Sequence, residues 1–274
     1  MVDGQQASFL LGENPPKDLR LSWSGKSVFG YSGRSPEKSD SDHSNEDAAL
    51  VFKRSEDEIV LAVADGAGGL PSGSQASRIA IESLYQALMD IHEDPQALLR
   101  SAIITGLDRG DETIRELGVG AGTTMTVVCI EHGLMRAFHV GDSGALVTGS
   151  RGKIKFQTIA HSPTGYAVAS GMMGDKEALT HEDRHFVSNL LGREDMRIEI
   201  GNSITLSPQD TVLLASDGLT DNLTTGEIVE FVRKGELNSA AQRLQSLALH
   251  RMQTESIHKP SKPDDMTFLL YRPR

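Results

Sequence analysis

Apolar and polar residues follow two different patterns along this chain, one typical of strands and one typical of helices. Short apolar runs between turn-forming residues predict strands at 48–53, 58–64, 123–130, 134–140, 144–148, 154–159, 196–200, 203–206, 211–216 and 266–271. Apolar residues at helical spacing predict helices from Ser72 or Ser74 to Ile91, from Asp94 to Leu107, at 225–234 and at 238–252.

The order of these elements predicts the fold class. Most strands follow one another through hairpins or short connections, and the strand–helix alternation of a doubly wound fold is missing. We therefore expect an α+β fold in which two packed, mostly antiparallel sheets are flanked by helices, an αββα sandwich. Residues 161–195 mix Gly, His and Met with short apolar patches, which indicates an inserted flap. Pro15 and Pro16 predict that 1–25 form an irregular lead-in, so we expect a single domain over 26–272.

Composition narrows the class of partner. A formal net charge of -11 disfavours nucleic acid, because nucleic-acid binding needs a basic surface. The single cysteine, Cys129, excludes a disulfide within the chain and lies in an apolar run typical of an inert buried thiol. No segment has the apolar length of a membrane span, and the N-terminus does not resemble a signal peptide. We expect a cytoplasmic monomer with no membrane partner.

Acidic residues stand where predicted strands end or begin. These aspartates are Asp47, Asp65, Asp217 and Asp264. Carboxylates gathered on rigid strand ends repel one another unless a cation lies between them, and Mg²⁺ or Mn²⁺ prefers such oxygen ligands. Each aspartate taken alone has an ordinary interpretation, since Asp-Gly is a common turn. Together they predict a metal centre.

Six motifs in a fixed order resemble the metal-dependent serine/threonine protein phosphatases of type 2C, in the form that bacterial members have. They are Asn45-Glu46-Asp47, Asp65-Gly66-Ala67-Gly68-Gly69, Gly122-Thr123-Thr124, Val140-Gly141-Asp142-Ser143, Ser216-Asp217-Gly218-Leu219 and Asp264-Asp265-Met266-Thr267. The resemblance covers residues 26–272, and 161–195 are similar to the family's flap. It implies that the protein hydrolyses phosphoserine and phosphothreonine in other proteins. It also implies that a serine/threonine kinase phosphorylates the same substrates.

The resemblance also implies roles for individual residues. The implied metal ligands are Asp47, Asp65, Gly66, Asp142, Asp217 and Asp264. Asp65 would bridge two Mg²⁺ or Mn²⁺ ions, while Asp217 and Asp264 hold one ion and Asp47 the other. Asp142, with Asp217, would hold a third ion, and Glu46 would act behind the ligands. A metal-bound water would attack phosphorus in line, so no protein nucleophile is required.

Among the positions that depart from the family pattern, one bears directly on phosphate binding. Asp42 stands where the family usually has a phosphate-binding arginine, and a carboxylate cannot bind phosphate directly. Arg34, Lys38 and His43 are the candidates to take its place. The departure leaves an alternative open: a catalytically weak, phosphatase-like regulatory or binding module. A structural Ca²⁺ site is a weaker alternative, because the sequence contains no Asp-x-Asp-x-Asp-Gly loop.

Overall fold

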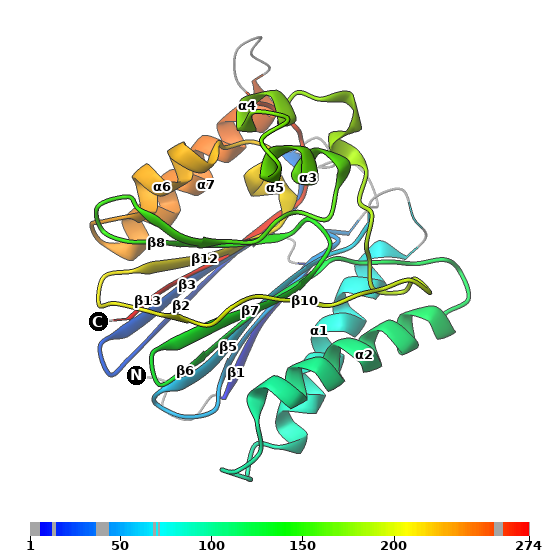
Figure 1. Cartoon of the computed structure of the whole chain (residues 1–274), viewed down its shortest axis with the longest axis vertical. Coiled ribbons are helices and arrows are strands. Elements are labelled where there is room, and N and C mark those ends of the chain that lie inside the picture. Colours follow the sequence, from blue (N-terminus) through cyan, green and yellow to red (C-terminus); the bar gives the residue numbers. More distant parts are fainter. Residues whose placement is uncertain are drawn as a thin grey trace.

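Two antiparallel sheets packed face to face form the centre of the protein, and helices cover both outer faces (Figure 1). The computed structural model describes residues 6–12, 15–36, 44–67, 70, 72–254 and 260–273. The arrangement confirms the predicted α+β sandwich. Among the described helices, none has the length and apolar character needed to cross a bilayer.

The first sheet carries the predicted Asp47 and Asp65 at the ends of two neighbouring strands. Its strands lie in the order β1-β4-β5-β6-β7-β10, with β11 also paired to β7. They are β1 (Ala7–Leu11), β4 (Asp47–Lys53), β5 (Glu58–Asp65), β6 (Met125–Glu131), β7 (Leu134–Val140), β10 (Glu199–Ile200) and β11 (Ile204–Thr205). Helices α1 (Gly73–Asp90) and α2 (Leu99–Glu116) cover its outer face (Figure 1).

The second sheet has the order β2-β3-β13-β12-β8-β9. Its strands are β2 (Lys17–Trp23), β3 (Lys26–Gly33), β8 (Gly144–Thr148), β9 (Ile154–Gln157), β12 (Thr211–Ala215) and β13 (Met266–Arg272). Helices α6 (Thr225–Val232) and α7 (Leu237–Gln253) cover its outer face, while the short α5 (Asp217–Thr220) follows β12 directly (Figure 1). The last strand of the chain therefore lies between β3 and β12, inside the sheet.

The alternation of side chains along the strands separates three apolar layers. On β4, Leu50 and Phe52 join the cluster under α1 and α2, whereas Ala49 and Val51 join the cluster that both sheets share. A third cluster lies between the second sheet and helices α6 and α7. Because each sheet is covered on both faces, its strands are nearly continuous in apolar residues, which is why the sequence pattern identified them.

Two expectations from the sequence were wrong. The described part of the predicted irregular lead-in contains two strands: β1 pairs with β4, and β2 pairs with β3. Pro15 and Pro16 lie between these strands and interrupt neither. The helix expected from Asp94 begins at Leu99 instead, because Asp94 accepts the backbone N–H groups of Gln96 and Ala97 in a turn.

The predicted flap consists of short helices and loops next to α5 (Figure 1). It contains α3 (Pro163–Ala169), α4 (Asp175–Ala178) and the 3-10 helix η2 (Glu182–His185). Ser162 is the N-cap of helix α3, and its hydroxyl accepts the N–H of Gly165 at 3.0 Å. Arg184 donates to the carbonyls of Leu179 and Ser261, and this links the flap to the segment that precedes β13.

Candidate metal centre

Two carboxylates face each other at one end of the first sheet. Asp47 begins β4, Asp65 ends β5, and the register places them directly opposite. Asp47 is 1% exposed. Burial, with the charge of Asp265, raises the pKa of Asp47 well above its ordinary value; burial together with Asp47 and Asp217 does the same to the pKa of Asp65. A like-charged pair in this position favours either protons or a cation.

The second sheet brings two more aspartates to the same end of the sandwich. Asp217 begins α5 two residues after β12, and Asp264 precedes β13 by two residues. Strands β12 and β13 are antiparallel neighbours, so the end of one meets the start of the other. Gly218 makes the approach possible, because a Cβ there would lie 1.8 Å from the carbonyl oxygen of Asp265.

Hydrogen bonds fix the two sheets to each other at this point. The hydroxyl of Ser216 donates to Asp47 Oδ2 at 2.8 Å. The buried carboxylate of Asp265 accepts the backbone N–H groups of Ser35 and Glu46, at 2.8 and 2.9 Å. Asp265, just before β13, is therefore bonded to Glu46, the residue before Asp47. Asp47 itself is bonded to Ser216, just after β12.

Asp142 lies in the turn between β7 and β8, and two threonines position it relative to Asp65. Thr124 Oγ1 accepts the backbone N–H of Asp65 at 3.1 Å and lies 2.6 Å from Ser143 Oγ. Thr123 Oγ1 donates to the carbonyl of Asp65 at 2.8 Å. Residues 122–124, which the sequence singled out only as a motif, thus connect Asp65 to the turn that carries Asp142.

A further aspartate, Asp221, belongs to the cluster and was missed from the sequence. It is the C-cap residue of α5, four residues after Asp217, so both carboxylates lie on the same side of the helix. Burial, with the charges of Asp217 and Asp221, raises the pKa of Asp142 to about 7. Burial and Asp217 raise the pKa of Asp221 to about 6. The spacing of four residues after Asp217 was the available signal.

Lys262 is the second residue that the sequence did not indicate. Its Nζ lies 2.5 Å from Asp217 Oδ2 and 3.1 Å from both Asp221 Oδ2 and Asp264 Oδ2. The side chain is 16% exposed. Burial lowers the pKa of Lys262, but the charges of Asp217, Asp221 and Asp264 outweigh that effect and raise it well above its ordinary value. Lys262 therefore carries a positive charge within the acidic cluster.

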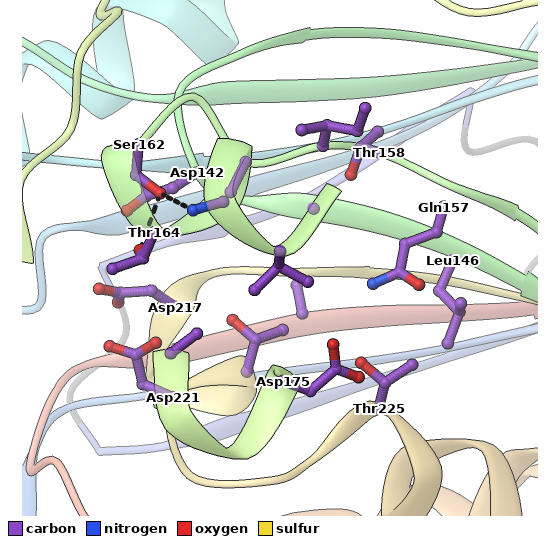
Figure 2. A pocket seen from close by; sticks show the side chains of 18 of the residues that line it. Asp142, Leu146, Gln157, Thr158, Ser162, Thr164, Asp175, Asp217, Asp221 and Thr225 are labelled. Atoms are coloured by element: carbon purple, nitrogen blue, oxygen red, sulfur yellow. Dashed lines mark hydrogen bonds between the residues drawn. The ribbon is translucent and has the colours of Figure 1, made fainter. Parts of the chain in front are cut away.

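A cavity of about 460 Å³ adjoins the cluster beneath the flap. The carboxylates of Asp142, Asp217 and Asp221 lie at one end, while Leu146 and Gln157 lie at the other (Figure 2). Its remaining walls come from the flap, β8 and α5 to α6. The cavity thus joins an acidic end to a space of mixed polar and apolar lining that is large enough for a substrate side chain.

Of the remaining predicted residues, some lie near the acidic cluster and others lie outside the described part of the chain. A Cβ on Gly66 would lie 2.3 Å from the carbonyl oxygen of Gly73, so only glycine fits between β5 and α1. Glu46 lies beside it, because its backbone carbonyl accepts the N–H of Gly66 at 3.1 Å. Arg34 follows Gly33, which pairs with Met266, and so lies at the same end of the sheet as Asp264. Lys38, Asp42 and His43 lie outside the described residues.

The donor set fits hard divalent cations. Among the described residues, no hydrogen-bond donor reaches the buried Asp47 Oδ1, although an unpaired buried carboxylate oxygen is costly. The ligands available around it are oxygens, the type that Mg²⁺ and Mn²⁺ select. A cation near Asp47 and Asp65 would satisfy this oxygen and offset the repulsion between the two carboxylates.

A second group of potential ligands is better explained as structural. One ligand atom from each of three residues lies within 4.8 Å of the others: His139, His161 and Glu199. However, His161 Nδ1 accepts from the backbone N–H of Gly141 at 3.1 Å and from Asn189 Nδ2 at 2.8 Å. Its proton therefore lies on Nε2 and is donated to Glu199 Oε2 at 3.1 Å, which leaves this ring without a lone pair for a metal. His161 instead positions the turn at Gly141.

Comparisons with known proteins agree with this geometry. A sequence model of the protein phosphatase 2C family matches residues 34–254. The protein phosphatase PhpP of Streptococcus pneumoniae is 28% identical over 194 residues, which cover 69% of this chain and 78% of PhpP. The serine/threonine phosphatase stp of Listeria monocytogenes is 27% identical over 205 residues, 70% of this chain and 78% of its own length.

Solved structures show the same fold. The S. agalactiae serine/threonine phosphatase has a TM-score of 0.73 at 23% identity, over 94% of this chain and 100% of the other. The catalytic domain of the phosphatase PstP, solved in complex with 2 manganese ions, has a TM-score of 0.70 at 24% identity, over 90% of this chain and 97% of the other.

Proposed function

The chain belongs to the protein phosphatase 2C family of metal-dependent serine/threonine phosphatases, and from this premise we propose that its acidic cluster is the catalytic centre. The observation that carries the proposal is the meeting of the opposed Asp47 and Asp65 with Asp217 and Asp264 at one end of the sandwich. The buried, unpaired Oδ1 of Asp47 supports a cation at this point.

We assign the metal ligands as follows. Asp65 would serve two ions, with the carbonyl of Gly66 as a further ligand, and Asp47 would hold one of them. Asp217 and Asp264 would hold the other. A third ion would be held by Asp142 and Asp217, and the placement of Asp221 adds a carboxylate there. Glu46 would orient the ligands from behind. Mg²⁺ and Mn²⁺ both suit such an oxygen set.

When bound, such ions provide the positive charge that activates water at neutral pH and neutralises the phosphate. The residues of the chain hold this charge in place, and the cavity beneath the flap receives the phosphorylated side chain. No protein nucleophile is needed. Cys129 is unsuited to that role, because it is buried in β6 and burial raises the pKa of its thiol well above the ordinary value.

The proposed substrate is phosphoserine or phosphothreonine in a protein that a serine/threonine kinase has modified. Among the three candidates for binding the phosphate, Arg34 is the one that lies within the described residues. It lies at the same end of the sheet as Asp264. With metal ions bound at its acidic end, the cavity suits a phosphorylated side chain, and Leu146 and Gln157 at the other end would contact the neighbouring segment (Figure 2). A cytoplasmic location, a monomeric state and the pairing with one kinase stay predictions.

A second candidate function is a phosphatase-like module that binds partners and turns over weakly. The observation that favours it is Lys262, whose ammonium group already pairs with three carboxylates of the proposed centre. The choice between the two functions depends on whether divalent ions bind and support turnover.

One assay distinguishes these functions. Hydrolysis of p-nitrophenyl phosphate and of a phosphothreonine peptide is measured with Mn²⁺ and with EDTA. We expect Mn²⁺-dependent turnover that Asp65→Asn and Asp217→Asn abolish and that Asp195→Asn, an exposed control, leaves unchanged. Mn²⁺ binding without turnover would favour the regulatory module, and turnover in EDTA would refute the metal mechanism.

A further inference from the structure

Lys262 occupies a position among the carboxylates that the proposed centre assigns to a divalent ion. Asp217 and Asp264, the two ligands of one proposed ion, both contact its Nζ through their Oδ2 atoms. Asp221, next to the third proposed ion, contacts it as well. An ammonium group and a divalent ion cannot both lie against these oxygens without strong repulsion, since the charges would be only a few ångströms apart.

The backbone that carries Lys262 is firmly held. Its N–H donates to Asn222 Oδ1 at 2.9 Å, and its carbonyl accepts from Asn222 Nδ2 at 2.8 Å. The same Nδ2 donates to the carbonyl of Gly218 at 2.9 Å. Asn222 is fully buried and follows Asp221, the C-cap residue of α5, so it connects the lysine to the helix that begins with Asp217. Pro263 further restricts the backbone of Lys262 to an extended conformation.

The side chain is not held in the same way. Lysine has a flexible four-carbon stem, and this one retains access to solvent, with 16% of the side chain exposed. Its contacts in the cluster are ion pairs to carboxylates, the same groups that a divalent ion would take. The ammonium group can therefore withdraw by changing rotamer, while Asn222 keeps its backbone in place.

We propose that Lys262 is a tethered cation that competes with a divalent ion for Asp217 and Asp264. The inference rests on the proposed metal centre and deepens it: the two principal ions bind with unequal affinity. The ion between Asp47 and Asp65 binds first, because Lys262 pairs with neither. The ion at Asp217 and Asp264 binds only when Lys262 withdraws, so its occupancy depends on the concentration of free metal.

Metal titration tests this competition without reference to catalysis. Isothermal titration of the full chain with Mn²⁺ is compared for the wild type, Lys262→Met, Lys262→Arg and the exposed control Lys153→Met. We expect Lys262→Met to bind Mn²⁺ at the weaker site at least about tenfold more tightly, since a competing charge is lost. Lys262→Arg and Lys153→Met should stay near the wild type. Equal isotherms for Lys262→Met and the wild type, within about twofold, would overturn the proposal.

Thermal unfolding provides a second readout that a purely structural lysine would not give. Removing Lys262 leaves three carboxylates without their cation, so Lys262→Met should lower the Tm in EDTA and recover it in Mn²⁺. A Tm deficit that Mn²⁺ does not recover would show a structural role only. Lys262→Gln serves the same comparison if the Met variant does not fold.

The outcomes also separate this proposal from the proposed function. If the wild type binds Mn²⁺ and hydrolyses p-nitrophenyl phosphate while Lys262→Met binds metal identically, only the competition is refuted. If neither protein binds Mn²⁺, and Asp65→Asn changes nothing, the metal centre itself is refuted.

Discussion

Asp47 faces Asp65 across the β4–β5 ladder, so two carboxylates form a cross-strand pair where opposite charges would be favoured. Ser216 from the other sheet donates to one oxygen of Asp47, and the described residues leave its second oxygen unpaired. The pair is thus an unfavourable arrangement that a cation would reverse. Removing one of these carboxylates should therefore raise the stability of the metal-free protein and lower its activity.

Replacing Asp65 of this pair should change stability and activity in opposite directions. Asp65→Asn removes a repelled charge, so we expect a Tm in EDTA higher than that of the wild type by about 2–4 °C or more. Mn²⁺-dependent hydrolysis of p-nitrophenyl phosphate should fall by at least about a hundredfold, because a ligand is lost. Thermal unfolding and initial rates measure both effects. A lower Tm in EDTA would contradict the repulsion.

Stability without metal should depend on pH through Asp142 and Asp221. Their pKa values in the folded state, about 7 and about 6, lie above the ordinary value of 3.8. The folded state therefore binds more protons than the unfolded state at intermediate pH. The contribution is fully present below pH 3.8 and is lost as the pH rises through about 6 to 7.

The measurement is the Tm in EDTA at pH 5 and pH 8, compared between the wild type and Asp142→Asn. Burial lowers the pKa of His139 and His161, which contribute the opposite trend. Both proteins contain these histidines, so the difference between them reports Asp142 together with its effect on Asp217 and Asp221. We expect the wild type to lose more stability towards pH 8, by about 5 °C or more. A constant difference across this range would argue against the raised pKa.

The hydrogen bond from Ser216 to Asp47 should matter for metal affinity. Ser216→Ala removes the donor at 2.8 Å and leaves the buried Asp47 Oδ2 less well oriented. We expect Mn²⁺ affinity to fall about tenfold, as for residues that support a metal ligand. The exposed Ser170→Ala serves as the matched control. Calorimetric titration decides the matter, and unchanged affinity in Ser216→Ala would exclude this positioning role.

Gly218 should tolerate no side chain. In Gly218→Ala the Cβ would meet the carbonyl oxygen of Asp265 at 1.8 Å, so α5 must move away from β13. We expect a loss of stability of about 1–3 kcal/mol and a loss of Mn²⁺-dependent turnover. Gly226→Ala is the matched control, because a Cβ there meets nothing within 4 Å. Similar denaturation midpoints for the two variants would contradict the close approach.

Much of the fold could be read from the sequence because strands covered on both faces are continuous apolar runs. Asp47, Asp65, Asp217 and Asp264 could be found for the same reason, since they mark the ends of those runs. The predicted hairpin at 131–133 and the buried Cys129 are likewise present. Local patterns were sufficient for each of these features.

Other features depend on contacts that no local pattern contains. Lys262 lies in a segment without periodicity, and long-range contacts such as the link to Asn222, 40 residues away, bring it to Asp217. Strand β1 is a short run near two prolines, and its pairing with β4 decides its structure. The start of α2 was misplaced because Asp94 caps a turn and not the helix.

The position of β13 has a consequence for the order in which the protein can assemble during synthesis. This strand lies between β3 and β12, so a nascent chain lacks the centre of its second sheet until residues up to Arg272 have left the ribosome. Asp264 and Lys262 emerge just before it. The proposed ligand Asp264 and the competing cation Lys262 therefore reach the site together, after translation has passed them. Shorter nascent chains cannot form the complete centre.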